Sequence, residues 1–126
     1  MSNAAIDVKN SAFWNDLCGS QLAKTLGIED HSPASLAKFD NWYFDFYPYL
    51  KPYVDQLDLA NENVCEIGLG YGTMCSYLAG QAKQYYAIDI AAGPVQMANL
   101  RLGYLNKGQT ARQASCHDLP FENEAL

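Results

Sequence analysis

In the second half of the chain, short apolar runs typical of strands alternate with stretches in which apolar residues recur at helical spacing. The runs Val64–Ile67 and Gln84–Ile90 are short and rich in β-branched and aromatic residues, which predicts buried strands. Each run is followed by apolar positions at helical spacing, over about Met74–Leu78 and from Gly93 to Gly108. A weaker third strand is predicted over Thr110–Cys116, and residues 122–126 are predicted to form a loop.

The order strand–helix–strand–helix–strand with short connections predicts right-handed parallel crossovers. The strand order is then 3-2-1, the first half of a doubly wound parallel sheet. We therefore assign residues 61–126 to the first half of an α/β, Rossmann-like domain, truncated before a fourth strand. Because the outer edge of the first strand is then unpaired, we expect a homodimer that shields this edge.

Residues 1–60 are predicted to form a helical segment, whose first ten residues are polar and expected to fray. Ser11 can begin a helix that Gly27 ends, with a possible break at Gly19. Ser32 followed by Pro33 predicts the start of the next helix, because serine caps and proline fits the first turn.

Pro48 must end or kink that helix, and a further helical piece is expected from Pro48 to about Leu57. One apolar face is predicted to consist of Leu36, Phe39, Tyr43, either Phe46 or Tyr47, and Leu50. The dense aromatic residues of this segment indicate a helix packed on the sheet. The alternative is that part of the segment forms a lid over a ligand pocket.

Composition narrows the class of partner. The 126 residues carry a net charge of −6, which argues against nucleic acid or an anionic membrane. No apolar run approaches the roughly 18 residues of a membrane span. The cysteines at 18, 65, 75 and 116 lack paired spacing, so we expect reduced thiols, no metal site and a cytoplasmic location.

Glycine occupies every second position after the first strand, at Gly68, Gly70 and Gly72. Such a turn lets a ligand lie against bare main chain, beside the N–H groups that begin a helix. Asp89 closes the second strand, where an acidic side chain can accept both hydroxyls of a ribose. These features predict a nucleotide-type pocket. Thr73 stands where a dinucleotide oxidoreductase would have its third glycine, which disfavours a nicotinamide cofactor.

Three motifs over residues 61–121 resemble those of Rossmann-fold S-adenosylmethionine-dependent methyltransferases. The first is an acidic residue, any residue and GxGxG, from Glu66 to Gly72. The second is the acidic residue Asp89 closing the second strand. The third, Asp118 before Leu-Pro-Phe121, is similar to the subgroup that acts on quinones and other small molecules.

The resemblance implies S-adenosylmethionine as cofactor, S-adenosylhomocysteine as product and a small-molecule methyl acceptor. It implies that Glu66 faces the amino group of the cofactor, that Asp89 holds its ribose and that Ile90 contacts its adenine. Asp118 would accept from the adenine amino group, with His117 as a neighbouring contact. The methionyl part would be lined by Gly68, Leu69, Gly70, Tyr71 and Gly72.

Simpler roles stay open for the acidic residues. Glu66 can satisfy loop N–H groups, Asp89 can cap the region of Gly93, and Asp118 can be an ordinary turn residue. We name no catalytic residue, because a sulfonium leaving group is already activated and positioning does most of the work. The alternatives to a methyltransferase are a non-catalytic fragment that binds cofactor or a partner and, less favoured, a nicotinamide-dependent oxidoreductase.

Overall fold

Three parallel strands form a sheet in the computed structural model, which describes residues 2–17 and 20–122. They are β1 (Asn63–Ile67), β2 (Gln84–Asp89) and β3 (Ala111–Gln113), with β2 in the middle. The register pairs Ile67 with Ile88 and Asp89 with Gln113. The predicted α/β class and the parallel 3-2-1 order are therefore confirmed. The third strand is shorter than the predicted Thr110–Cys116.

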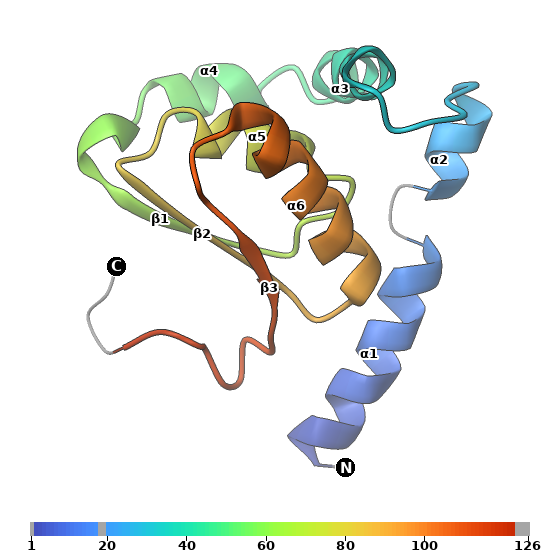
Figure 1. The fold of residues 1–126 in the computed structure, drawn as a ribbon, viewed down its shortest axis with the longest axis vertical. Helices are drawn as coiled ribbons and strands as arrows, with labels where there is room; N and C mark the ends of the chain where they lie inside the picture. Colours follow the sequence, from blue (N-terminus) through green and yellow to red (C-terminus); the bar gives the residue numbers. More distant parts are fainter. Residues whose placement is uncertain (1, 18–19, 123–126) are drawn as a thin grey trace.

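Two helices, α5 (Thr73–Ala79) and α6 (Ala92–Leu105), lie against one face of this sheet (Figure 1). The core between them contains small and aliphatic residues together with one tyrosine. Its buried members are Leu69, Cys75, Ala79, Tyr85, Ala87, Ala98, Leu102 and Ala111. Helix α6 contributes Ala98 and Leu102 to this core, and its Val95 and Leu105 pack against it.

Helix α6 ends earlier than the predicted stop at Gly108. Its C-cap is Asn106, which adopts left-handed angles (φ 55°, ψ 42°) and donates its N–H to the carbonyls of Leu102 and Gly103. Asparagine tolerates this conformation better than most residues, so it can end a helix as glycine does. Gly108 also has a positive φ, 73°, but lies beyond the helix.

The N-terminal segment consists of α1 (Asn3–Leu17), α2 (Ser20–Thr25), α3 (Pro33–Phe46), α4 (Leu50–Asp55) and the 3₁₀ turn η1 (Leu59–Asn61). The expected fraying of residues 1–10 is wrong, because α1 begins at Asn3. The Ser2 hydroxyl accepts from the Ala5 N–H at 3.2 Å, as a helix cap does. Helix α1 runs beside α6 (Figure 1). The predicted break at Gly19 and the loop over residues 123–126 fall outside the described residues.

Helix α3 begins as its sequence predicts. The Ser32 hydroxyl accepts from the Ser35 N–H at 3.3 Å, and Pro33 occupies the first turn. Leu36 and Phe39 are buried, and Tyr47 rather than Phe46 is half-buried. The helix ends just before Pro48, and α4 follows, as predicted.

Strand β1 is less buried than expected. It lies at the edge of the sheet, and its last residue, Ile67, is 56% exposed. Within the described ranges β1 pairs with β2 alone, so its outer edge has no neighbouring strand. Over those same ranges, no helix has the length and apolar character needed to cross a membrane.

Candidate functional site

The turn between β1 and α5 is built on left-handed backbone angles. Gly68, Gly70 and Gly72 have φ values of 85°, 56° and 84°. A side chain in this region costs about 1–2 kcal/mol, because its Cβ approaches the following carbonyl. The Gly68 N–H donates to the Ile88 carbonyl at 3.0 Å, so the turn starts directly from the strand ladder. The predicted strand–turn–helix arrangement is confirmed.

The first and third glycines of the turn have different surroundings. A Cβ built on Gly68 would meet no atom within 4 Å. A Cβ on Gly72 would lie 2.7 Å from Cδ of Arg101. Gly68 therefore leaves open space, whereas the space beside Gly72 is filled by Arg101. The main chain of Gly72 as part of the ligand site stays a prediction.

A cavity of about 560 Å³ lies at the carboxyl ends of the strands. Because the strands are parallel, their ends bring together residues far apart in the sequence. The strand ends and the glycine turn supply Ile67, Gly68, Gly70, Asp89 and Ile90, α1 supplies Ile6, Asp7 and Asn10, and the segment after β3 supplies Ala114, Cys116 and His117. Its volume is within the range usual for pockets that hold small molecules and cofactors.

Asp89 is held between the two strand ends. It is 7% exposed, and its Oδ2 accepts from the Leu69 N–H at 2.7 Å, while Oδ1 accepts from the Ala91 N–H at 2.8 Å. Ala91 is the N-cap of α6, so the bond from its N–H places the Asp89 carboxylate at the start of that helix. Each carboxylate oxygen can accept a further hydrogen bond, which leaves capacity for a ligand hydroxyl.

His117 and Asp7 form a pair in the wall of the cavity. Nδ1 of His117 lies 3.3 Å from Oδ1 of Asp7, and their side chains are 42% and 20% exposed. Asp7 is not among the residues that the sequence predicts for the site, because fraying of residues 1–10 would leave it without a fixed position. Asp118 is exposed and does not line the cavity; its N–H donates to the Ser115 carbonyl at 3.1 Å, as in a turn.

Glu66 lies on the other side of the glycine turn. Its Oε1 accepts from the Tyr85 hydroxyl at 2.6 Å, and its side chain lines a second cavity of about 260 Å³. Burial raises the pKa of Glu66 to about 7, a rise that the nearby Asp89 charge reinforces and the Tyr85 hydrogen bond opposes. Burial and the Glu66 charge also raise the pKa of Tyr85.

The second cavity is mostly aromatic. Phe39, Trp42, Tyr43 and Tyr47 of α3 line it, together with Leu22, Glu66, Leu69, Tyr71, Thr73, Met74 and the glycines at 68 and 70. Since Gly68 and Gly70 line both cavities, these two glycines form their shared boundary.

The predicted site residues therefore divide into three groups. The larger cavity brings together Gly68, Gly70, Asp89, Ile90 and His117. Glu66, Leu69 and Tyr71 line the second cavity, with the same two glycines. Gly72 and Asp118 line neither.

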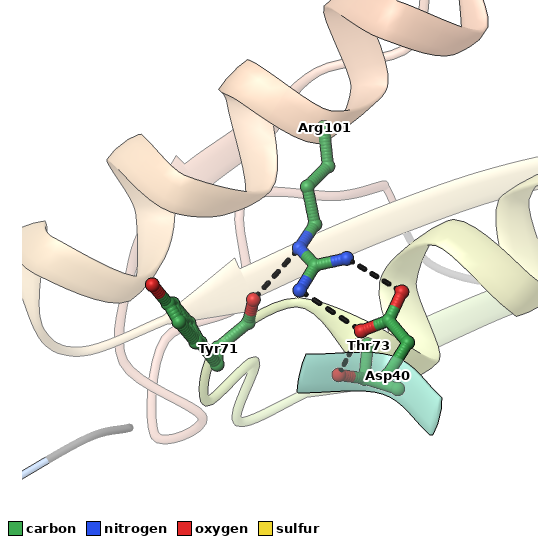
Figure 2. A network of polar contacts seen from close by, with 4 residues as sticks. All are labelled: Asp40, Tyr71, Thr73 and Arg101. Carbon is green, nitrogen blue, oxygen red and sulfur yellow. Dashed lines mark hydrogen bonds and ion pairs between the residues drawn. The ribbon is translucent and has the colours of Figure 1, made fainter. Parts of the chain in front are cut away.

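A buried polar network, which no sequence motif predicts, lies behind the turn (Figure 2). Arg101, 3% exposed, donates from Nε to the Tyr71 carbonyl at 2.8 Å and from both terminal nitrogens to Asp40 at 2.9 and 3.0 Å. The Thr73 hydroxyl donates to Asp40 at 2.6 Å. An arginine on the apolar face of a predicted helix, next to Leu102, was the clue available from the sequence.

Among the side chains that the structure describes, no three His, Cys, Asp or Glu residues are grouped so that they could hold a metal ion. The polar groups at the large cavity are the Asp89 carboxylate, the His117–Asp7 pair, the side chains of Asn10 and Cys116, and bare main chain. Such groups suit hydroxyls and aromatic nitrogen heterocycles better than a cation.

Comparison with known proteins finds a similarity in the second half of the chain. Residues 65–126 match the model of a protein family described as a methyltransferase domain. No curated protein and no solved structure matches the chain significantly. The matched residues contain the glycine turn, the Asp89 strand end and the segment with His117. Residues 65–126 are therefore similar to a methyltransferase domain, of a family whose members generally bind S-adenosylmethionine.

Proposed function

We propose that this chain binds S-adenosylmethionine in the larger cavity and forms the cofactor-binding part of an S-adenosylmethionine-dependent methyltransferase. The observation that carries the proposal is the meeting of Gly68 and Gly70 with Asp89 and Ile90 around one 560 Å³ cavity. A glycine turn supplies space for the ligand, and the acidic end of the next strand supplies a ribose partner.

The residues present suit the parts of this cofactor. Asp89 retains free acceptor capacity for the ribose hydroxyls, and Ile90 offers an apolar surface to the adenine. His117 lies in the same cavity, beside the place proposed for the adenine. The amino group would lie toward Glu66, across the boundary that Gly68 and Gly70 form between the cavities. Since Asp118 lines neither cavity, we assign it no contact with the adenine.

When bound, the sulfonium supplies an already activated methyl group. The protein then has to hold the acceptor in line with the methyl group and exclude competing geometries, which requires no base among its own residues. We propose a small molecule as the acceptor. The open space of the larger cavity and the aromatic walls of the second favour a small molecule over a polymer.

Calorimetric titration of the 126-residue chain with S-adenosylhomocysteine tests the proposal. We expect saturable binding, and at least tenfold weaker binding by Asp89→Asn, which loses the charge and one acceptor oxygen beside the ribose. Asp45→Asn, an exposed change of the same kind on α3, serves as the matched control. Titration with NADH is the competing arm: heat with NADH and none with S-adenosylhomocysteine would reject the assignment.

A further inference from the structure

We propose that Arg101 and Asp40 are positioning residues for the cofactor site, although neither lines either of the two cavities described above. They fix the shape of the glycine turn from behind and connect it to α3. This inference rests on the proposed function, because it concerns how the same turn is kept ready for S-adenosylmethionine.

Arg101 binds the middle of the glycine turn. Nε of Arg101 donates to the carbonyl of Tyr71, which lies between Gly70 and Gly72, at 2.8 Å (Figure 2). Both flanking glycines have left-handed angles, and glycine has more backbone freedom to lose than any other residue. A hydrogen bond from a buried guanidinium restricts that freedom where the ligand needs a fixed surface.

The side chain of Arg101 also packs closely against Gly72. The Arg101 side chain approaches Gly72 so closely that a Cβ there would lie 2.7 Å from Cδ and 2.9 Å from Nε. The third glycine of the turn thus accommodates the arginine. Its guanidinium also lies 5.7 Å from the centre of the Tyr71 ring, and the Phe39 ring meets that ring edge-on at 4.2 Å. Tyr71 is therefore held by α6 on one side and by α3 on the other.

Asp40 connects three helices behind the turn. Its carboxylate accepts two hydrogen bonds from Arg101 and one from the hydroxyl of Thr73, the first residue of α5. One side chain of α3 thus joins α6 to the start of the helix that follows the turn. Asp89 holds the front of the turn through the Leu69 N–H, and the Arg101–Asp40 pair holds its back.

A buried ion pair is a weak way to gain stability, because desolvation offsets much of the attraction. Arg101 is 3% exposed and the Asp40 side chain 23% exposed, so a large part of that cost applies here. What the pair supplies is geometry: a planar fork with several fixed donors, which a lysine cannot reproduce. The pair therefore fixes the shape of the turn and adds little stability.

The test compares cofactor affinity with stability. We expect Arg101→Lys and Asp40→Asn each to weaken S-adenosylhomocysteine binding at least tenfold in calorimetry, at a temperature where circular dichroism shows both variants folded. Hydrogen exchange of the free protein should rise at residues 69–73 and stay unchanged in β2. Arg112→Lys and Asp45→Asn are the matched controls, since both residues are exposed and far from the turn in sequence.

Thr73→Val provides a milder variant if either substitution prevents folding. It removes only the hydroxyl that donates to Asp40, and it should weaken binding about two- to fivefold. Lower melting temperatures with binding within twofold of wild type would overturn the inference and leave a merely structural pair. A wild-type chain that binds no S-adenosylhomocysteine would reject the proposed function instead, and exchange at residues 69–73 would still decide whether the pair fixes the turn.

Discussion

The ionisation of the Glu66 side chain depends on the fold. Its pKa rises from 4.5 to about 7, chiefly because burial disfavours the carboxylate. The folded protein thus binds this proton more tightly than the unfolded chain does. Stability contributed by the proton is fully present below pH 4.5 and is lost as the pH rises through about 7.

Replacing Glu66 with glutamine should remove this dependence. We expect the free energy of unfolding of Glu66→Gln to rise relative to wild type by about 1–3 kcal/mol between pH 4.5 and pH 8. Urea titrations at several pH values measure the difference. The exposed Glu62→Gln should follow the wild-type curve. Parallel curves for Glu66→Gln and wild type would contradict the raised pKa.

Alanine substitutions at the two ends of the glycine turn should differ in their effect on stability, because the space beside Gly68 is open and the space beside Gly72 is filled by Arg101. Gly68→Ala is expected to cost about 1–2 kcal/mol of stability from left-handed strain alone, and to weaken S-adenosylhomocysteine binding. Gly72→Ala should cost at least about 1 kcal/mol more, because the methyl group also collides with Arg101. Urea denaturation gives both values.

Gly103→Ala is the control for these two changes. Gly103 lies within α6 and its Cβ would meet nothing within 4 Å, so alanine should stabilise the protein by about 0.5–1 kcal/mol. Equal losses for Gly68→Ala and Gly72→Ala would show that the contact with Arg101 has no energetic consequence.

At the scale of elements, the end of α6 depends on one unusual residue. Asn106 has φ 55°, a conformation in which glycine is unstrained and a Cβ-bearing residue is not. Asn106→Gly should therefore stabilise the protein by up to about 1 kcal/mol, and Asn106→Ala should destabilise it by a similar amount. Thermal melting of the two Asn106 variants shows which one is more stable than wild type and which is less stable. A more stable alanine variant would mean that the helix ends elsewhere in solution.

Elements defined by local sequence could be predicted, whereas those that depend on distant contacts could not. The Ser32–Pro33 cap, the stop before Pro48 and the parallel strands each follow from local propensity and spacing. The start of α1 was missed, because its polar sequence gives no amphipathic pattern and Ser2 is a cap only once the helix exists.

The same distinction applies to the site. Gly68 and Asp89 belong to a continuous motif that sequence spacing reveals. Asp40 and Arg101 are 61 positions apart, and only the packing of α3 against α5 and α6 brings them to the turn. Asp7 is likewise placed beside His117 by the position of α1. No local pattern encodes such contacts, although a buried-face arginine indicates that one exists.

At the scale of the whole molecule, the outer edge of β1 is the main unsatisfied feature of the sheet. Within the described residues β1 has one neighbouring strand, and Ile67 at its end is 56% exposed. An open strand edge with apolar side chains readily pairs with another strand, and most proteins protect such edges. We propose that in the isolated chain two copies associate along β1 about a two-fold axis, so that each edge shields the other.

A charge at the end of this edge should oppose that association. We expect sedimentation velocity at micromolar concentration to show a dimer for wild type and mainly monomer for Ile67→Lys, because a charged side chain on an exposed strand edge opposes pairing with another strand. Leu100→Lys, which adds the same charge at an exposed position of α6, should remain dimeric. Loss of the dimer in both variants would point to net charge rather than the strand edge. A wild-type chain that sediments as a stable monomer would show that the β1 edge is protected without a second copy.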